Sequence, residues 1–266
     1  KLSGGAVGHW RPDTPKGNHW SPKRLKSQHT SNDKVVYFPS CASRTMGADP
    51  GRQDSRSLTE ITYDLLQKAK FEVLFPKELN SLCCGMPFQS KGFLNLADEK
   101  REALNQALLK ASNNGEWPIL FDTSPCTARM KEGLDERLTL LDPIRFALDY
   151  LMPKLSVTPT DEAISLHVTC STTRSGLADA MLTLAKQLSR KVTIPEGIGC
   201  CGFAGDKGFS TPELNASALR NLKSQLPNDC RRGVSSSRTC EIGLSEHAGI
   251  PYQSILYLLD EVSEAL

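Results

Sequence analysis

The chain has 266 residues, of which 39% are apolar and 23% are charged, and its mean hydropathy is -0.34. This composition is typical of a globular protein and excludes disordered and fibrous chains. The formal charge of +2 gives no electrostatic reason to expect a nucleic-acid partner. No apolar run approaches the ~20 residues of a membrane-spanning helix, so we expect no transmembrane segment. The nine cysteines are too few for a disulfide scaffold and need another explanation.

Residues 1–33 are rich in Gly, Pro, Ser, Lys and Asn without periodicity, which predicts an extended arm or linker. Trp10 and Trp20 each follow a histidine. We expect both to lie on this protein's own surface, with anchoring onto a neighbouring domain as the alternative. The chain begins at Lys1, with neither an initiator Met nor an apolar signal segment, and we interpret it as a fragment of a longer protein.

After the arm, strand-like and helical patterns alternate along the chain. Short β-branched or aromatic runs predict strands at 35–39, 72–76, 117–122, 165–169, 191–195 and 231–236. Apolar residues at helical spacing predict helices at 55–71, 97–112, 144–155, 176–190, 211–226 and 252–266. Thr211 and Pro212 form a helix entry, with Thr at the cap and Pro at the first helical position. This alternation predicts right-handed crossovers and largely parallel sheets.

The cysteine motifs occur twice in the same order. CCGMPFQSKGF begins at Cys83 and CCGFAGDKGF begins at Cys200; each is preceded by an apolar run that ends in one cysteine and followed by a further cysteine. The upstream segments also share an arginine and a glycine, Arg44 and Gly47 in the first, Arg174 and Gly176 in the second. We therefore expect two homologous α/β halves, at 34–155 and 163–266, each a mostly parallel sheet flanked by helices. Residues 156–162 are expected to connect them.

Eight of the nine cysteines belong to this repeat. Four of them lie just beyond the carboxyl ends of predicted strands, and the two vicinal pairs follow predicted strands after a short loop. In open parallel sheets this is the edge where ligands bind, so four thiols in each half are expected to converge there. The eight are Cys41, Cys83, Cys84, Cys126, Cys170, Cys200, Cys201 and Cys240. Cys230 has no counterpart and is interpreted as an ordinary thiol.

Several chemistries use convergent thiols. Disulfides are disfavoured because a bond between adjacent cysteines is strained. Structural zinc accepts four thiolates but usually takes them from C-x2-4-C pairs, which do not occur here. An iron–sulfur cluster also takes four thiolates, and Lys91 and Lys207 would then offset its negative charge, unless they are solvated loop residues. Buried thiols that pack as small apolar groups remain the alternative to any metal.

These motifs resemble the cysteine-rich CCG-domain family. The resemblance covers residues 34–266, rests on the duplicated CCG motif and implies that each half is Rossmann-like. That family includes the B subunit of heterodisulfide reductase and the iron–sulfur subunit of glycolate oxidase. The segments SPCTARM, CCGFAGDKGF and SRTCEIGL are most similar to the C-terminal iron–sulfur region of bacterial FAD-linked D-lactate and D-2-hydroxyglutarate dehydrogenases.

The resemblance implies a function for the chain as an iron–sulfur electron-transfer module of an FAD-linked oxidoreductase. The eight repeat cysteines would be the ligands of [4Fe-4S]-type clusters, which carry electrons from FAD to a quinone, a cytochrome or another acceptor. FAD would belong to a dehydrogenase domain or subunit, expected in the missing N-terminal portion, and would oxidise a D-2-hydroxy acid. This fragment alone would then turn over no substrate. The implied location is cytoplasmic, with peripheral attachment at the inner face of the cell membrane as an option.

The sequence departs from the family pattern where a C-x-x-C pair is expected. Thr123 and Ser237 stand three positions before Cys126 and Cys240, so each half lacks a fifth cysteine. This favours electron relay over heterodisulfide-reductase-like disulfide chemistry, and a zinc-stabilised docking domain remains the third hypothesis. His167 is expected in the core or beside the site, and His247 in a loop, so neither is a candidate catalyst. GGAVG near the N-terminus lacks the strand and helix context of a dinucleotide site.

Overall fold

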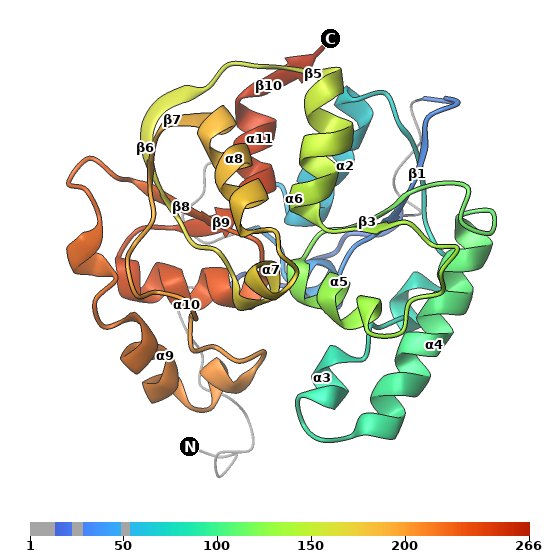
Figure 1. Ribbon diagram of the computed structural model, residues 1–266, viewed down its shortest axis with the longest axis horizontal. Helices are drawn as coiled ribbons and strands as arrows, with labels where there is room; N and C mark the ends of the chain where they lie inside the picture. The colour runs from blue at the N-terminus through green and yellow to red at the C-terminus, as the bar shows by residue number, and fades with distance from the viewer. Residues whose placement is uncertain (1–13, 23–28, 49–53) are drawn as a thin grey trace.

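The computed structural model describes residues 14–22, 29–48 and 54–266, and within them the chain forms two α/β halves side by side (Figure 1). The first sheet has the order β2-β1-β3-β4, and the second has the order β7-β6-β8-β9. All neighbouring strands in both sheets are parallel. The strands are β1 (Lys34–Phe38), β2 (Glu72–Leu74), β3 (Ile119–Phe121), β4 (Leu140–Leu141), β6 (Thr160–Leu166), β7 (Ser189–Thr193), β8 (Arg232–Ser235) and β9 (Tyr252–Ser254). The predicted Rossmann-like halves are thus confirmed, each with its first strand second in the sheet.

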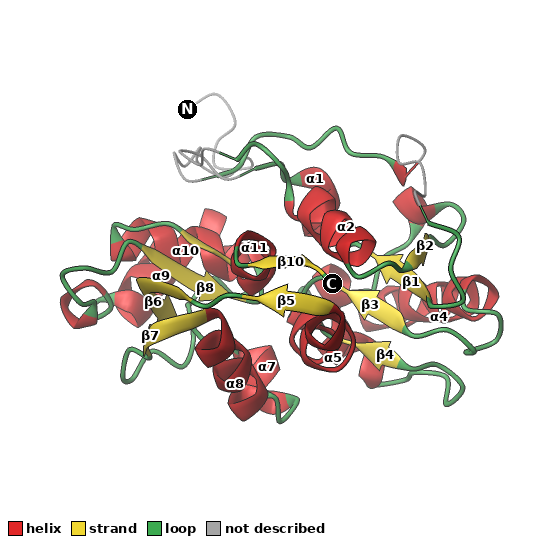
Figure 2. Cartoon of the chain, turned by 90° about the horizontal axis from the view of Figure 1, so that it is seen from above, coloured by secondary structure: helices red, strands yellow, loops and turns green. Residues whose placement is uncertain are grey.

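Helices cover both faces of each sheet (Figure 2). In the first half they are α1 (Cys41–Thr45), α2 (Leu58–Lys68), α3 (Met86–Gln89), α4 (Leu94–Ala111), α5 (Ser124–Lys131) and α6 (Pro143–Phe146). In the second half they are α7 (Cys170–Arg174), α8 (Ala178–Leu188), α9 (Pro212–Leu219), α10 (Arg238–Ala248) and α11 (Ile255–Glu261). Short 3-10 or π turns lie at Leu79–Ser81, Ala147–Leu151, Met152–Lys154, Lys207–Phe209 and Lys223–Gln225. Among the described helices none is long and apolar enough to cross a bilayer.

Strand β1 carries an unbroken apolar run, residues 35–38, because both of its faces are buried. In β1, Val35 and Tyr37 face a central core, whereas Val36 and Phe38 face an outer core beneath α4 and α5. The central core also takes side chains from β6, β8, α2, α8 and α11, so both halves share it. Figure 1 shows α2, α6, α8 and α11 standing together between the two sheets. The halves are therefore joined by a common hydrophobic core.

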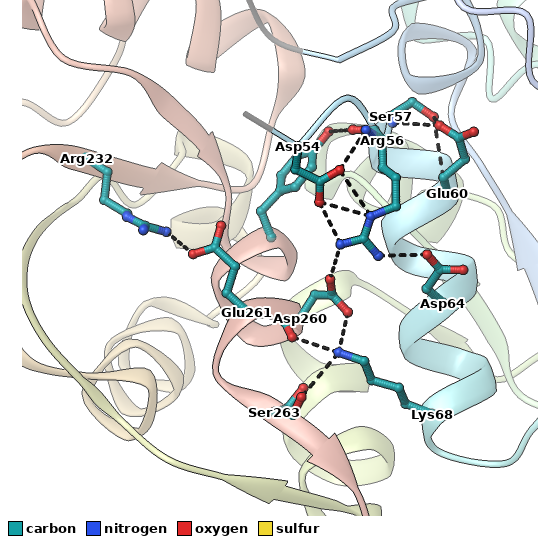
Figure 3. Close-up of polar contacts among 11 residues, drawn as sticks. Asp54, Arg56, Ser57, Glu60, Asp64, Lys68, Arg232, Asp260, Glu261 and Ser263 are labelled. Carbon is teal, nitrogen blue, oxygen red and sulfur yellow. Dashed lines mark hydrogen bonds and ion pairs between the residues drawn. The ribbon is translucent and has the colours of Figure 1, made fainter. Parts of the chain in front are cut away.

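The closing segment of the chain fastens the second half to the first. Helix α11 packs against α2, and β10 (Ser263–Ala265) pairs antiparallel with β5 (Leu155–Val157). Asp260 on α11 has a side chain only 4% exposed, and it pairs with Arg56 at 2.8 Å and Lys68 at 2.6 Å. Arg56 also bonds Asp54 and Asp64 (Figure 3). This polar network closes the rim of the shared core.

Three expectations about local structure were wrong. The segment 156–162, expected as a connection, contains the end of β5 and the start of β6, because β10 and β7 supply hydrogen-bonding neighbours for it. The segment 252–266, expected as one amphipathic helix, contains β9, α11 and β10. Likewise the helix expected at 211–226 ends at Leu219 and is followed by a short 3-10 turn.

The part of the N-terminal arm that the structure describes lies on the first half. Gly17 forms an antiparallel bridge with Met46, and the Asn18 side chain donates to the carbonyl of Ser43 at 2.9 Å. The ring of Trp20 packs edge-on against Phe75 with centroids 5.6 Å apart. Trp20 therefore packs on its own chain, as expected, whereas Trp10 lies outside the described residues.

Candidate metal centre

The repeat cysteines follow strand ends in both halves. Cys41 begins α1 directly after β1, and Cys126 lies in the first turn of α5 after β3. Cys83 and Cys84 follow β2 and the 3-10 turn at Leu79–Ser81. The hydroxyl of Ser40 caps α1 by accepting from the N–H of Ser43, which ends the strand and turns the chain toward the site. The parallel sheet thus brings cysteines far apart in sequence to one edge.

A buried carboxylate joins the two strands that carry Cys41 and Cys126. Asp122, 1% exposed at the end of β3, accepts hydrogen bonds from the backbone N–H of Ser40 and the hydroxyl of Tyr37, both at 2.9 Å. Burial raises the pKa of Asp122 above its ordinary value, and these hydrogen bonds oppose that rise. Asp122 therefore fixes the spacing between the starts of α1 and α5. Sequence reasoning missed this residue, which carries no repeat signal because Ser236 stands at its place in the second half.

All four repeat thiols of the first half meet. Sγ of Cys84 donates to Sγ of Cys126 at 3.3 Å, while the thiols of Cys41 and Cys83 hydrogen-bond each other. Cys83 also accepts from the Gly85 N–H at 3.4 Å. Hydrogen bonds from Cys41 and Cys84 lower the pKa of Cys83, whereas the pKa of Cys41 is raised, first by its bond to Cys83 and then by burial. One thiolate is thus favoured in a group of sulfur donors, and thiolates are the form that binds metals.

Three repeat thiols meet in the second half. Sγ of Cys201 donates to Sγ of Cys240 at 2.9 Å, Cys200 and Cys201 also share a hydrogen bond, and the Gly202 N–H donates to Cys200 at 3.4 Å. Cys170 is exposed at the start of α7, and no hydrogen bond joins it to these thiols in the part of the chain that is described. The structure thus gathers three of the four thiols expected to converge here. Cys230 lies at the other end of β8, where its thiol donates to the carbonyl of Arg232 at 3.3 Å.

The glycine of each CCG motif has a structural reason. Gly85 and Gly202 have φ of 85° and 70°, in the left-handed region that side chains disfavour. A Cβ on Gly85 would collide with the carbonyl oxygen of Ala97 on α4, and a Cβ on Gly202 would collide with that of Leu214 on α9. Helices α4 and α9 can therefore pack directly on the loops that hold the vicinal cysteines.

The two halves meet near the thiols through buried hydroxyl groups. The N–H of Ser124 donates to the carbonyl of Ser236 at 3.1 Å, and the hydroxyls of Thr172 and Ser124 are 3.2 Å apart. Thr123 and Ser237, at the places of the absent fifth cysteines, are the buried N-cap residues of α5 and α10. The Thr123 hydroxyl donates to the carbonyl of Ser236 at 3.2 Å and so forms part of the contact between the halves.

Charged groups near the thiols include one that sequence reasoning overlooked. Lys91 forms an exposed ion pair with Asp206 at 2.7 Å, which links the CCG loops of the two halves, and Lys207 is exposed. Arg44, in contrast, is half-buried. Its charge lowers the pKa of Cys83 in the same direction as the hydrogen bonds there, and it opposes the causes that raise the pKa of Cys41. The sequence signal that could have identified Arg44 is its recurrence as Arg174 in the second copy of the repeat.

The donor set fits a thiophilic metal group, although the thiols lie too close together to hold an ion as they stand. Within the described segments, no group of three His, Cys, Asp or Glu side chains is spaced for a metal ion. The Cys84–Cys126 and Cys201–Cys240 separations of 3.3 and 2.9 Å are shorter than the about 3.8 Å between thiolates on a tetrahedral zinc ion. Loading must therefore break these S–H···S contacts. The sulfur-only donors, the close backbone at each glycine and the Arg44 cation suit an anionic iron–sulfur group.

His167 is buried directly after β6, with Nδ1 3.1 Å from the hydroxyl of Ser235. Burial lowers its pKa to about 4. The ring is therefore neutral at physiological pH, which matches the expectation of a core residue rather than an acid–base catalyst.

Comparisons with known proteins give relatives among the curated proteins and several distant structures. Lactate utilization protein A of Oceanobacillus iheyensis is 26% identical over 209 residues, which cover 72% of this chain and 79% of that protein. Picrophilus torridus aspartate racemase gives a TM-score of 0.37 at 11% identity, covering 88% of this chain and 96% of its own. Aquifex pyrophilus glutamate racemase also gives 0.37 at 11% identity, covering 86% of this chain and 81% of its own. TM-scores this low carry no argument about function.

A family model described as the CCG cysteine-rich domain matches residues 35–131 and 164–245, which together make up most of the chain. The two matches contain strands β2, β3, β7 and β8 and all eight repeat cysteines. The chain therefore belongs to the CCG cysteine-rich domain family.

Proposed function

We propose that the chain is an iron–sulfur electron-transfer module of a flavin-linked oxidoreductase that acts on lactate or a related D-2-hydroxy acid. The observation that carries the proposal is the meeting of Cys41, Cys83, Cys84 and Cys126 at one sheet edge. Sulfur-only donors select iron–sulfur clusters or zinc over harder ions. The similarity to Lactate utilization protein A supports the choice of substrate class.

In this proposal the protein residues hold the group and adjust its surroundings. Cys84 and Cys126 lie in the outer core of the first half, and Cys201 and Cys240 in that of the second, which keeps water from one side of each site. When bound, an iron–sulfur cluster supplies a one-electron carrier. Thr123 and Ser237 carry hydroxyls in place of thiols, and the Thr123 hydroxyl bonds the Ser236 carbonyl across the halves, so neither residue supplies a fifth thiol. This favours electron relay over disulfide chemistry.

The remaining partners follow from electron balance. A hydroxy acid gives up two electrons and two protons as it becomes a keto acid, so a flavin on a partner domain or subunit must accept them first. The clusters would then pass the electrons singly to a quinone, a cytochrome or another carrier. We propose that this exchange takes place in the cytoplasm, with peripheral attachment at the inner face of the cell membrane as an option.

The proposal is tested by iron and acid-labile sulfide analysis of the chain purified without oxygen, together with EPR spectra of the reduced protein. We expect iron and sulfide in equal amounts and a cluster signal. The variants Cys84→Ser and Cys201→Ser should each lower the iron content. Cys230→Ser is the matched control, since this buried thiol lies at the opposite end of β8 and should leave iron unchanged. Stoichiometric zinc, or anaerobic protein without iron, would refute the proposal in favour of a docking domain.

A further inference from the structure

The two thiol sites are built alike but are held in place by different residues. Both have the glycine N–H donating to the first vicinal cysteine at 3.4 Å. In the second half, Asn215 on α9 is fully buried and donates to the carbonyl of Cys201. In the first half, the loop before Cys83 is held instead by Arg44.

Arg44 joins two cysteine-bearing segments. It lies on α1, three residues after Cys41. Its Nη1 donates to the carbonyl of Leu79, and its Nη2 donates to that of Leu82 at 2.8 Å. Both carbonyls belong to the segment that leads directly into Cys83. The guanidinium also lies over the ring of Phe38, 5.6 Å from its centroid, which fixes its plane.

The same side chain places a fixed positive charge at the site. Arg44 is half-buried, so its charge is screened less than that of an exposed residue. Its Nε is buried and has no acceptor among the residues that the structure describes. A guanidinium with a spare buried donor suits a site that gathers negative sulfur.

Arg174 lies at the matching end of α7 but makes no such bridge. Its charge favours the thiolate of Cys200, yet its side chain forms no hydrogen bond within the described segments of the chain. In that half the helix-start cysteine, Cys170, is exposed and stays apart from the other three thiols. The presence of the bridge thus coincides with a gathered cysteine, and its absence with an outlying one.

We propose that Arg44 is a positioning residue of the first thiol site, which fastens Cys41 against Cys83 and Cys84 through the carbonyls of Leu79 and Leu82. The second site has the corresponding charge without the bridge, so Cys170 must move in when that site is loaded. It follows that the first site is preorganised and retains a metal group longer. The last statement rests on the proposed function; the bridge itself does not.

The bridge is tested on metal-free, reduced protein by measuring how fast iodoacetamide alkylates Cys41 and Cys170, with mass spectrometry of the peptides. In the wild type Cys41 should react more slowly than Cys170. A hydrogen bond to a charged group changes the equilibrium between closed and open forms of a segment on the order of tenfold. Arg44→Gln should therefore increase the alkylation rate of Cys41 by about tenfold or more. Loss of the charge alone has the opposite effect, because it raises the thiol pKa and slows alkylation. The direction of the change therefore separates a bridge from an electrostatic role.

Two further variants complete the design. Arg44→Lys keeps the charge without the two-pronged donor and should also expose Cys41, whereas Arg174→Gln should leave the Cys41 rate within twofold. If Arg44→Gln leaves the Cys41 rate unchanged or lowers it, while the circular dichroism spectrum remains that of the wild type, the bridge is refuted. A variant that fails to fold leaves Arg44→Lys to decide the same question.

Retention is measured on anaerobically loaded protein by the release of Fe(II) to a chelator. We expect a slow and a fast phase; Cys84→Ser should remove the slow phase and Cys201→Ser the fast one. Arg44→Gln should accelerate the slow phase about tenfold. Loss of the slow phase in Cys201→Ser instead would overturn the assignment. Wild-type protein that binds no iron refutes the proposed function, while the alkylation result still decides the role of Arg44.

Discussion

Replacing the glycine of a CCG motif with alanine perturbs both the backbone and the packing of the following helix. Gly85 has φ of 85°, and Gly92, seven residues later, has φ of 83°. An alanine at either position must adopt the left-handed conformation, which costs about 1–2 kcal/mol. A Cβ at Gly92 has nothing within 4 Å, whereas a Cβ at Gly85 meets the backbone carbonyl of Ala97. Because backbone cannot move aside as a flexible side chain can, Gly85→Ala should cost a further about 1–3 kcal/mol.

The assay is urea unfolding of metal-free, reduced protein, followed by circular dichroism, with Gly92→Ala as the control for backbone strain. The second half offers the same comparison, since a Cβ at Gly202 is blocked by Leu214 and one at Gly205, with φ of 76°, meets nothing within 4 Å. We expect each blocked position to lose more free energy of unfolding than its open partner, by about 1–3 kcal/mol. Gly85→Ala should also lower the iron content, because the Gly85 N–H holds Cys83. Equal losses at Gly85 and Gly92 would refute the close-packing argument.

Two further predictions concern buried charged and titratable groups. Asp260→Ala removes a carboxylate that pairs with Arg56 and Lys68 and should lower the free energy of unfolding by about 1–3 kcal/mol. The control Asp161→Ala breaks an exposed ion pair and should lower it by less than about 0.5 kcal/mol. Equal urea midpoints for the two variants would contradict this prediction. Burial lowers the pKa of His167 to about 4. The unfolded chain therefore binds more protons than the folded one between about pH 6.5 and 4, so stability falls as pH falls through this window, by up to about 3 kcal/mol. Urea unfolding across these pH values should show a steeper loss in the wild type than in His167→Gln, and parallel curves would contradict the assignment.

The sequence predicted the longer elements because their patterns are local. In β1 an unbroken apolar run marked a strand with both faces buried, and in α2 the apolar spacing marked a helix, which begins with a Ser57–Glu60 capping box in the structure. The duplication of the cysteine motifs predicted the division into two homologous halves. The short strands β4, β5, β9 and β10 were missed, because two or three residues become a strand only when a neighbouring strand supplies hydrogen bonds.

The candidate site, like the fold, was predictable from the sequence only in part. The sequence by itself determined the donor type and the placement of eight cysteines at strand ends, because a repeated motif and the direction of parallel strands are local information. Only the tertiary structure decided that four thiols meet in the first half and three in the second. It also decided which cation serves the site: Lys91 pairs with Asp206, whereas Arg44 reaches carbonyls some 35 residues away. Such contacts depend on where distant segments come to lie in three dimensions, and no local pattern encodes them.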